Sequence, residues 1–168
     1  MSLTNVLGTL GDSLTGVLAD VFTAIGPWNV LVEHCQDPRI ELSDEKLASP
    51  LLWVIDGEEH LASDSNGQTY EEVGLLLTLQ MKIFENPAQQ KDVTAETLLW
   101  SLSGYLGMAM RYLKPLERDD ANDYVPLIEA DGSRWICVKA QRQQSRDWQR
   151  WHENRVFYAE ALTHWRRY

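Results

Sequence analysis

The most informative segment of this chain runs from Pro50 to Phe84 and reads PLLWVIDGEEHLASDSNGQTYEEVGLLLTLQMKIF. It opens with an apolar run, residues 51–55, which lies between the proline and Asp56-Gly57 and is rich in β-branched and aromatic side chains. A run this short and this apolar predicts a strand that is buried on both faces. The segment therefore begins with a strand of the core.

The end of the same segment alternates between apolar and other side chains. The apolar positions are two residues apart: Leu75, Leu77, Leu79, Met81 and Ile83. Between them stand Thr78, Gln80 and Lys82. This period of two predicts a strand with one buried face and one face in water.

A polar, acidic stretch, residues 57–73, connects these two strands, with Asn66-Gly67 near its middle. Asn-Gly favours the positive φ angles of a tight turn, so the stretch predicts a long protruding hairpin, called the arm below. The arm has few apolar residues and cannot bury much surface within its own subunit. We therefore expect other subunits or partners to hold it.

Two amphipathic helices are predicted outside this segment. Apolar side chains recur at three- and four-residue steps through residues 3–25, and Gly26-Pro27 is expected to end this helix. A second helix is predicted between a cap at Asp92 or Thr94 and its end at Pro115. The Gly residues of the first helix weaken it, so its stability must come from packing.

The remaining apolar runs predict short strands at residues 28–34, 124–128 and 135–139, the last two joined through an Asp131-Gly132 turn. Residues 156–165 suit a strand and a helix equally, because their apolar side chains recur at both spacings. The order of elements predicts one α+β domain covering all 168 residues. It would have a single mostly antiparallel sheet, two main helices packed on one face, and a long protruding β-hairpin.

The charge of the chain limits its function. A formal net charge of −10 argues against a protein that grips nucleic-acid phosphates or an acidic membrane. Residues 134–168 carry eight basic and three acidic side chains, a local charge of +5, so the rest carries −15. Such a division suits stacking on further copies or on a partner of matching polarity, although chance clustering on a solvated surface explains it equally well.

The cysteines and histidines show no pattern of a metal site. Cys35 and Cys137 lie in apolar surroundings and are expected to be buried, reduced thiols, with a disulfide left open. His34 precedes Cys35, but neighbours on a strand point to opposite faces, and no second pair at zinc spacing exists.

An acidic cluster on the arm, formed by Glu58, Glu59, His60 and Asp64, could hold a divalent cation, but a solvated run of charges explains it better. Neither a phosphate-binding glycine loop nor a Gly-x-Ser-x-Gly elbow occurs. We therefore predict a protein without catalytic activity, cofactor or metal.

Residues 141–154 are polar and lack apolar periodicity, which predicts an exposed loop. Its arginines and tryptophans (Arg146, Trp148, Arg150, Trp151) would suit a stacking platform for single-stranded nucleic acid. The same residue types are enriched at interface hot spots. The overall acidity favours a protein interface.

The order of these elements resembles the tail-terminator (tail completion) family of long-tailed bacteriophages. The features that carry the resemblance follow an initial amphipathic helix: the strand Pro50–Ile55, the arm start Gly57-Glu58-Glu59, the strand from Leu75 to Asn86-Pro87-Ala88, a helix, and a closing segment Val156–Tyr168. The loop of residues 141–154 and the seven tryptophans have no counterpart in that pattern.

The resemblance implies a structural protein of the virion, made in the host cytoplasm. It would form a homohexameric ring at the head-proximal end of the tail, ending polymerisation of the tail tube protein and meeting the head-completion or connector protein. DNA would pass through the lumen without specific binding, because acidic groups repel phosphates. Subunit or partner contacts are expected from the arm and the Arg/Trp loop: Glu58, Glu59, Asp64, Glu71, Glu72, Arg146, Trp148, Arg150 and Trp151.

Two other functions fit parts of the sequence. A small acidic binding or adaptor protein of the cytoplasm could mask a basic partner with its acidic surface. An enzyme could use the Glu58, Glu59, His60 and Asp64 cluster with a metal. Tight one-to-one capture of a basic partner would favour the first, and binding of divalent ions would favour the second.

Overall fold

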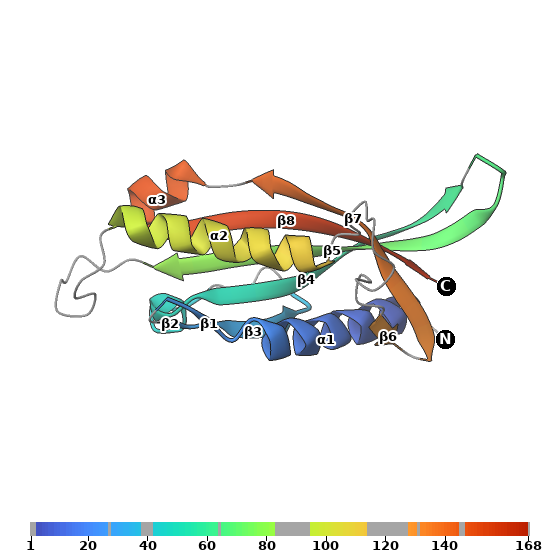
Figure 1. The fold of residues 1–168 in the computed structure, drawn as a ribbon, viewed down its shortest axis with the longest axis horizontal. Helices are drawn as coiled ribbons and strands as arrows, with labels where there is room; N and C mark the ends of the chain where they lie inside the picture. The colour runs from blue at the N-terminus through green and yellow to red at the C-terminus, as the bar shows by residue number, and fades with distance from the viewer. Residues whose placement is uncertain are drawn as a thin grey trace, which may run out of the picture.

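The chain folds into one six-stranded sheet with two long helices, α1 (Leu3–Val21) and α2 (Ala95–Leu113), which confirms the predicted α+β class (Figure 1). The structure, a computed structural model, describes residues 3–26, 28–37, 42–63, 65–82, 95–113, 128–130, 132–144 and 147–167. The predicted helix caps Asp92 and Thr94, the helix end at Pro115 and the predicted strand start at residues 124–127 lie outside these ranges.

The strands of the main sheet lie in the order β3-β4-β5-β8-β7-β6. Their bounds are Leu31–Cys35 for β3, Leu51–Ser63 for β4, Thr69–Lys82 for β5, Ile128–Ala130 for β6, Ser133–Gln144 for β7 and Val156–Arg167 for β8. Neighbours are antiparallel except β3 and β4, which run parallel. The segment that suited both a helix and a strand is thus a strand, β8, between β5 and β7.

The N-terminal region differs from the prediction. Helix α1 ends at Val21 rather than near Ile25, and the predicted strand of residues 28–34 is divided. A small separate hairpin, β1 (Ala24–Ile25) and β2 (Trp28–Asn29), intervenes. Gly26 lies between its strands at a φ of 55°, a conformation that glycine adopts without strain, so this glycine turns the chain here.

The predicted pair of long strands is the centre of the sheet. β4 and β5 pair antiparallel from Leu51↔Gln80 to Ser63↔Thr69. Gly67 takes the positive φ of 78° that the Asn-Gly turn predicts. Another short hairpin joins β6 and β7 at Gly132, whose φ of 71° also agrees with its predicted turn.

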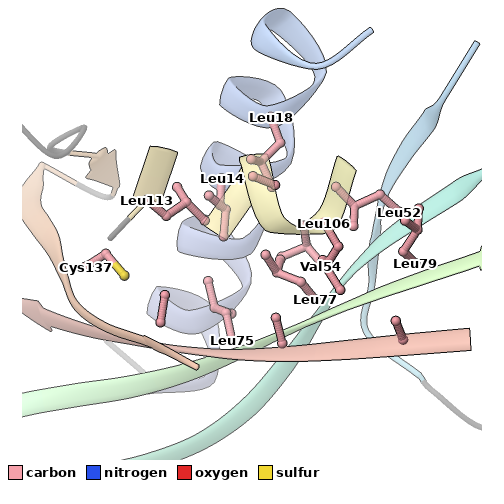
Figure 2. Close-up of a cluster of buried hydrophobic side chains, with 14 of the residues drawn as sticks. Leu14, Leu18, Leu52, Val54, Leu75, Leu77, Leu79, Leu106, Leu113 and Cys137 are labelled. Atoms are coloured by element: carbon pink, nitrogen blue, oxygen red, sulfur yellow. The ribbon is translucent and has the colours of Figure 1, made fainter. Parts of the chain in front are cut away.

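The main core lies between the two helices and one face of the sheet. Figure 2 shows leucines of both helices meeting side chains of β4, β5 and β7. The fully buried members that it labels are Leu14 and Leu18 of α1, Leu106 and Leu113 of α2, Leu52 and Val54 of β4, Leu75, Leu77 and Leu79 of β5, and Cys137 of β7. The alternating leucines of β5 therefore carry the predicted buried face, and the helices share that face.

A smaller cluster covers the opposite face of the sheet. Leu51, Trp53 and Ile55 of β4 pack there with Cys35 and Leu47, the latter from the short 3-10 helix η1 (Lys46–Ala48). Every residue from 51 to 55 is buried, so β4 is covered on both faces, as its apolar run predicts.

The prediction of a wet face on β5 is wrong. Thr78 and Gln80 are 0% and 6% exposed, and the amide of Gln80 donates a 3.3 Å hydrogen bond to the Thr78 hydroxyl. The chain around η1 lies against β5, where the Lys82 ammonium meets Asp44 at 2.6 Å. A covering segment from outside the strand therefore buries polar side chains that local alternation assigns to water.

Two glycines give opposite predictions for stability. A Cβ at Gly57 would lie 2.6 Å from the carbonyl oxygen of Gly74 on β5, whereas a Cβ at Gly104 in α2 would meet nothing within 4 Å. We expect Gly57→Ala to lower the free energy of unfolding by about 1–3 kcal/mol through overpacking. Gly104→Ala should raise it by about 1 kcal/mol, because alanine favours helix. Urea denaturation of both variants checks the pair, and equal effects would contradict the close β4–β5 approach.

Candidate assembly interface

The arm is a two-stranded ribbon that extends beyond the sheet. β3 pairs with β4 only as far as Ile55, and β8 begins its pairing with β5 at Glu72↔Arg166. Beyond these points β4 and β5 pair only with each other among the described residues. Figure 1 shows this hairpin reaching past the labelled elements, as predicted. An isolated two-stranded hairpin is marginal in water, so its free part needs further support.

The root of the arm is held by the C-terminal strand. Glu72, which is 8% exposed, accepts two hydrogen bonds from the Arg166 guanidinium, at 2.6 and 2.9 Å. That guanidinium also stacks on the Tyr70 ring, 4.4 Å from its centroid. Glu71 pairs with Arg167 at 3.0 Å in a more exposed position. Both hydrogen bonds go to Oε1 of Glu72, and these charge-assisted contacts tie the root of the arm to β8.

These contacts change the interpretation of the predicted interface residues. Glu71 and Glu72 each have a cationic partner within their own subunit. Glu58 and Glu59 belong to β4 within the arm, but their side chains and the whole of Asp64 lie outside the described residues. Of the acidic residues predicted to contact other subunits, Glu71 and Glu72 are therefore already paired within their own subunit.

The predicted Arg/Trp loop is not a loop. β7 continues to Gln144, and helix α3 (Trp148–Asn154) follows. The Asp147 carboxylate caps α3 by accepting a 3.0 Å hydrogen bond from the Arg150 amide, and Arg155 ends the helix at a φ of 55°. A seven-residue helix with no apolar stripe has too little periodicity for sequence analysis to detect.

The side chains of α3 do not form the stacking platform that the sequence suggested. Arg150 lies over the Tyr158 ring of its own subunit, 3.8 Å from the centroid, and its Nε lies 3.3 Å from Asp147. Trp151 packs against the main core. Trp148 is 50% exposed, and Arg146 lies outside the described residues. The Trp148 ring lies near that of His152, 6.3 Å between centroids, and is the more exposed of the two tryptophans of α3.

Tyr158 completes this cluster on β8. Burial raises its pKa, and its hydroxyl donates a hydrogen bond to Glu160, which raises it further. The phenol therefore stays neutral in the physiological range and serves as an aromatic support for Arg150. This end of the sheet is built for packing rather than for proton transfer.

The arm and α3 lie at opposite ends of the long axis of the molecule (Figure 1). Three basic residues of the segment 134–168 are divided between these ends, because Arg166 and Arg167 stand at the root of the arm and Arg150 belongs to α3. These three arginines therefore do not share one surface. The arm and α3 of one subunit cannot touch each other.

Helix α2 presents an exposed apolar stripe, whose aromatic side chains the sequence analysis did not single out. Trp100, Met108 and Tyr112 are 65%, 51% and 37% exposed, at four-residue steps that place them on one line with the exposed Gly104. The spacing of 100, 104, 108 and 112 was the available signal, but only the packing of α2 shows that this line faces away from the core.

A polar triad lies where α1 meets the sheet, and it too was missed. His34 of β3 places Nδ1 2.7 Å from Oδ1 of Asp12 on α1 and Nε2 2.7 Å from Oδ1 of Asp56 on β4. Its side chain is 7% exposed, against 72% for Asp12 and 20% for Asp56. Cys35 points to the other cluster, so the prediction that the two neighbours face opposite ways is confirmed.

Within the described residues, no group of three or more His, Cys, Asp or Glu side chains is arranged to hold a metal ion. Cys35 and Cys137 are both buried and unpaired with each other. Burial raises the pKa of Cys137 to about 12, so this thiol is unreactive at neutral pH. No helix in the described ranges is long and apolar enough to span a membrane.

Comparisons with known proteins do not assign a family. No family model matches the chain, and no curated protein matches it. One solved structure, of a protein whose name states no function, aligns with 100% of this chain and 96% of its own length. Its sequence identity is 10% and its TM-score is 0.41, and a likeness at that level carries no argument.

The contribution of the ion pair at the root of the arm to stability can be tested by mutation. We expect Arg166→Met to lower the free energy of unfolding by about 1–3 kcal/mol, because the buried Glu72 carboxylate loses two charged hydrogen bonds. Arg167→Met is the matched control and should cost less than about 0.5 kcal/mol, since its pair with Glu71 is exposed. Urea denaturation of both variants measures this, and equal losses would show that Arg166 does not anchor the arm.

Proposed function

We propose that this protein is a ring-forming structural protein of the tail-terminator type. It would close the head-proximal end of a phage tail tube and join that end to the head connector. The observation that carries the proposal is the two-stranded arm, which leaves the sheet at Glu72↔Arg166 and finds no third strand among the described residues. An exposed ribbon of this kind is a template for pairing or packing with another chain.

The position of the arm favours head-to-tail contacts between copies. The arm lies at one end of the long axis, and the exposed Trp148 belongs to α3 at the other end (Figure 1). A contact that joins two different surfaces repeats from copy to copy and closes into a ring when the rotation allows it. The family resemblance of the sequence suggests six subunits for that ring.

The charge of the chain also suits this role. The net charge of −10 suits a lumen through which DNA passes, because acidic walls repel phosphates. In this role the tail tube protein and the head-completion or connector protein would be the partners, and the protein would reside in the virion tail.

Assembly tests the proposal directly. Light scattering of the purified chain should give a mass near six times the 19.3 kDa of one subunit, and electron microscopy should show rings, alone or on isolated tail tubes. A strict monomer that never attaches to tail tubes would overturn the proposal. If that monomer instead captured a basic protein in a one-to-one complex, the acidic adaptor would be the correct function.

Charge reversal on the arm locates the contact. The double variant Glu58→Lys, Glu59→Lys should weaken assembly about 10- to 100-fold, because like or mismatched charges across an interface cost one to a few kcal/mol. The control carries the same charge change at two exposed sites away from the arm, Asp20→Lys and Glu45→Lys. Concentration-dependent light scattering compares the two, and equal weakening would exclude the arm as the contact.

A further inference from the structure

The hydrogen bonds of His34 define its charge. Both ring nitrogens lie 2.7 Å from carboxylate oxygens, one of Asp12 and one of Asp56. An ionised carboxylate only accepts hydrogen bonds, and a neutral imidazole donates from one nitrogen alone. While both carboxylates are ionised, two donors are needed to satisfy both contacts, and only the doubly protonated imidazolium supplies them.

The site is shaped for this ring. A Cβ on Gly11 of α1 would overlap the His34 ring and come within 2.9 Å of Oδ1 of Asp56, so the helix can approach the sheet here only because residue 11 is glycine. Asp12 from α1 and Asp56 from β4 are the charged groups that face the imidazole. Three elements, α1, β3 and β4, thus meet at one protonated side chain.

The triad also adjoins the arm. Asp56 is followed directly by Gly57, and the β4–β5 register shifts between Asp56 and Glu59. Such a bulge bends its strand and increases its twist, so it sets the direction in which the arm leaves the sheet. A contact that moves Asp56 therefore acts on the start of that bend.

We propose that Asp12, His34 and Asp56 form a proton-dependent latch that couples the docking of α1 to the root of the arm. With His34 protonated, the imidazolium ties α1 to β4. When the ring loses one proton, its unprotonated nitrogen and the carboxylate that faces it are both acceptors. The hydrogen bond between them is then lost. The latch is a conformational device, and it holds whether or not the protein forms a ring.

The direction of the pH dependence follows from the ring environment. Burial lowers the pKa of His34, but the hydrogen bonds to Asp56 and Asp12 and the charges of both carboxylates outweigh it and raise the pKa above its usual 6.5. A group whose pKa is raised by folding stabilises the fold fully below its unfolded-state pKa. That stabilisation is lost as the pH rises through the folded-state pKa, so the latch opens on the alkaline side.

Imidazole NMR of the full chain tests the charge state. Between pH 5.5 and 9.5, the His34 signals, assigned by their loss in His34→Gln, should show both nitrogens protonated to a pH above the usual imidazole pKa of 6.5. A His34 ring with one unprotonated nitrogen at pH 6 would overturn the proposal.

Hydrogen exchange tests the coupling. After correction for intrinsic exchange, protection of the amides in α1 and in residues 56–63 should fall together by about ten-fold as His34 deprotonates, which corresponds to the loss of one charged hydrogen bond. His34→Gln should abolish this dependence on pH. If the pH dependence persists in His34→Gln, or if α1 changes while residues 56–63 do not, the latch is wrong.

A conservative variant guards against simple loss of folding. Asp12 is 72% exposed, so Asp12→Asn should leave the fold intact while removing one of the two negative charges that face the His34 imidazolium. The pH midpoint of the protection change should then move down. Asp20→Asn, on an exposed position of the same helix, should leave the midpoint unchanged. A purely structural role for Asp12 predicts no shift in either variant.

Discussion

The antiparallel pairing of β4 with β5 is the constraint on which the rest of this structure depends. The same ladder supplies two central strands of the core and, farther along, the whole of the arm. β5 also pairs with β8, and its two ladders place Leu77 and Leu79 against the helices and Glu72 opposite Arg166. A slip of β5 by one residue against both neighbours would turn its leucines toward the opposite face and separate that ion pair. Core packing and arm direction are therefore fixed together.

Sequence reasoning succeeded where one strand or helix carries its own signal. The apolar run of residues 51–55, the alternating leucines of β5 and the Asn66-Gly67 turn each predicted the observed element, because period and turn chemistry are local properties. It failed where another part of the chain decides the outcome. Thr78 and Gln80 are buried on a strand that the segment around η1 contacts, and the alternation of β5 cannot predict that a distant segment will pack there.

The candidate interface was predicted in outline and not in detail. A polar hairpin too poor in apolar residues to cover itself could be found from the sequence, and it does extend beyond the sheet. The partners of Glu71 and Glu72 could not, because Arg166 and Arg167 lie more than 90 residues away along the chain. The triad of Asp12, His34 and Asp56 could not be predicted either, because its members come from three elements that only the fold brings together.

The place of β8 in the sheet has a consequence for biosynthesis. This strand follows all the others in the chain, yet it lies between β5 and β7. Until the ribosome has released residues 156–167, the sheet exists as two separate pieces, and one edge of β5 has no neighbour. Because translation adds only about 5–20 residues per second, a nascent chain exposes this leucine-rich edge to other nascent chains for a time. β8 is therefore the strand whose pairing joins the two pieces into one sheet.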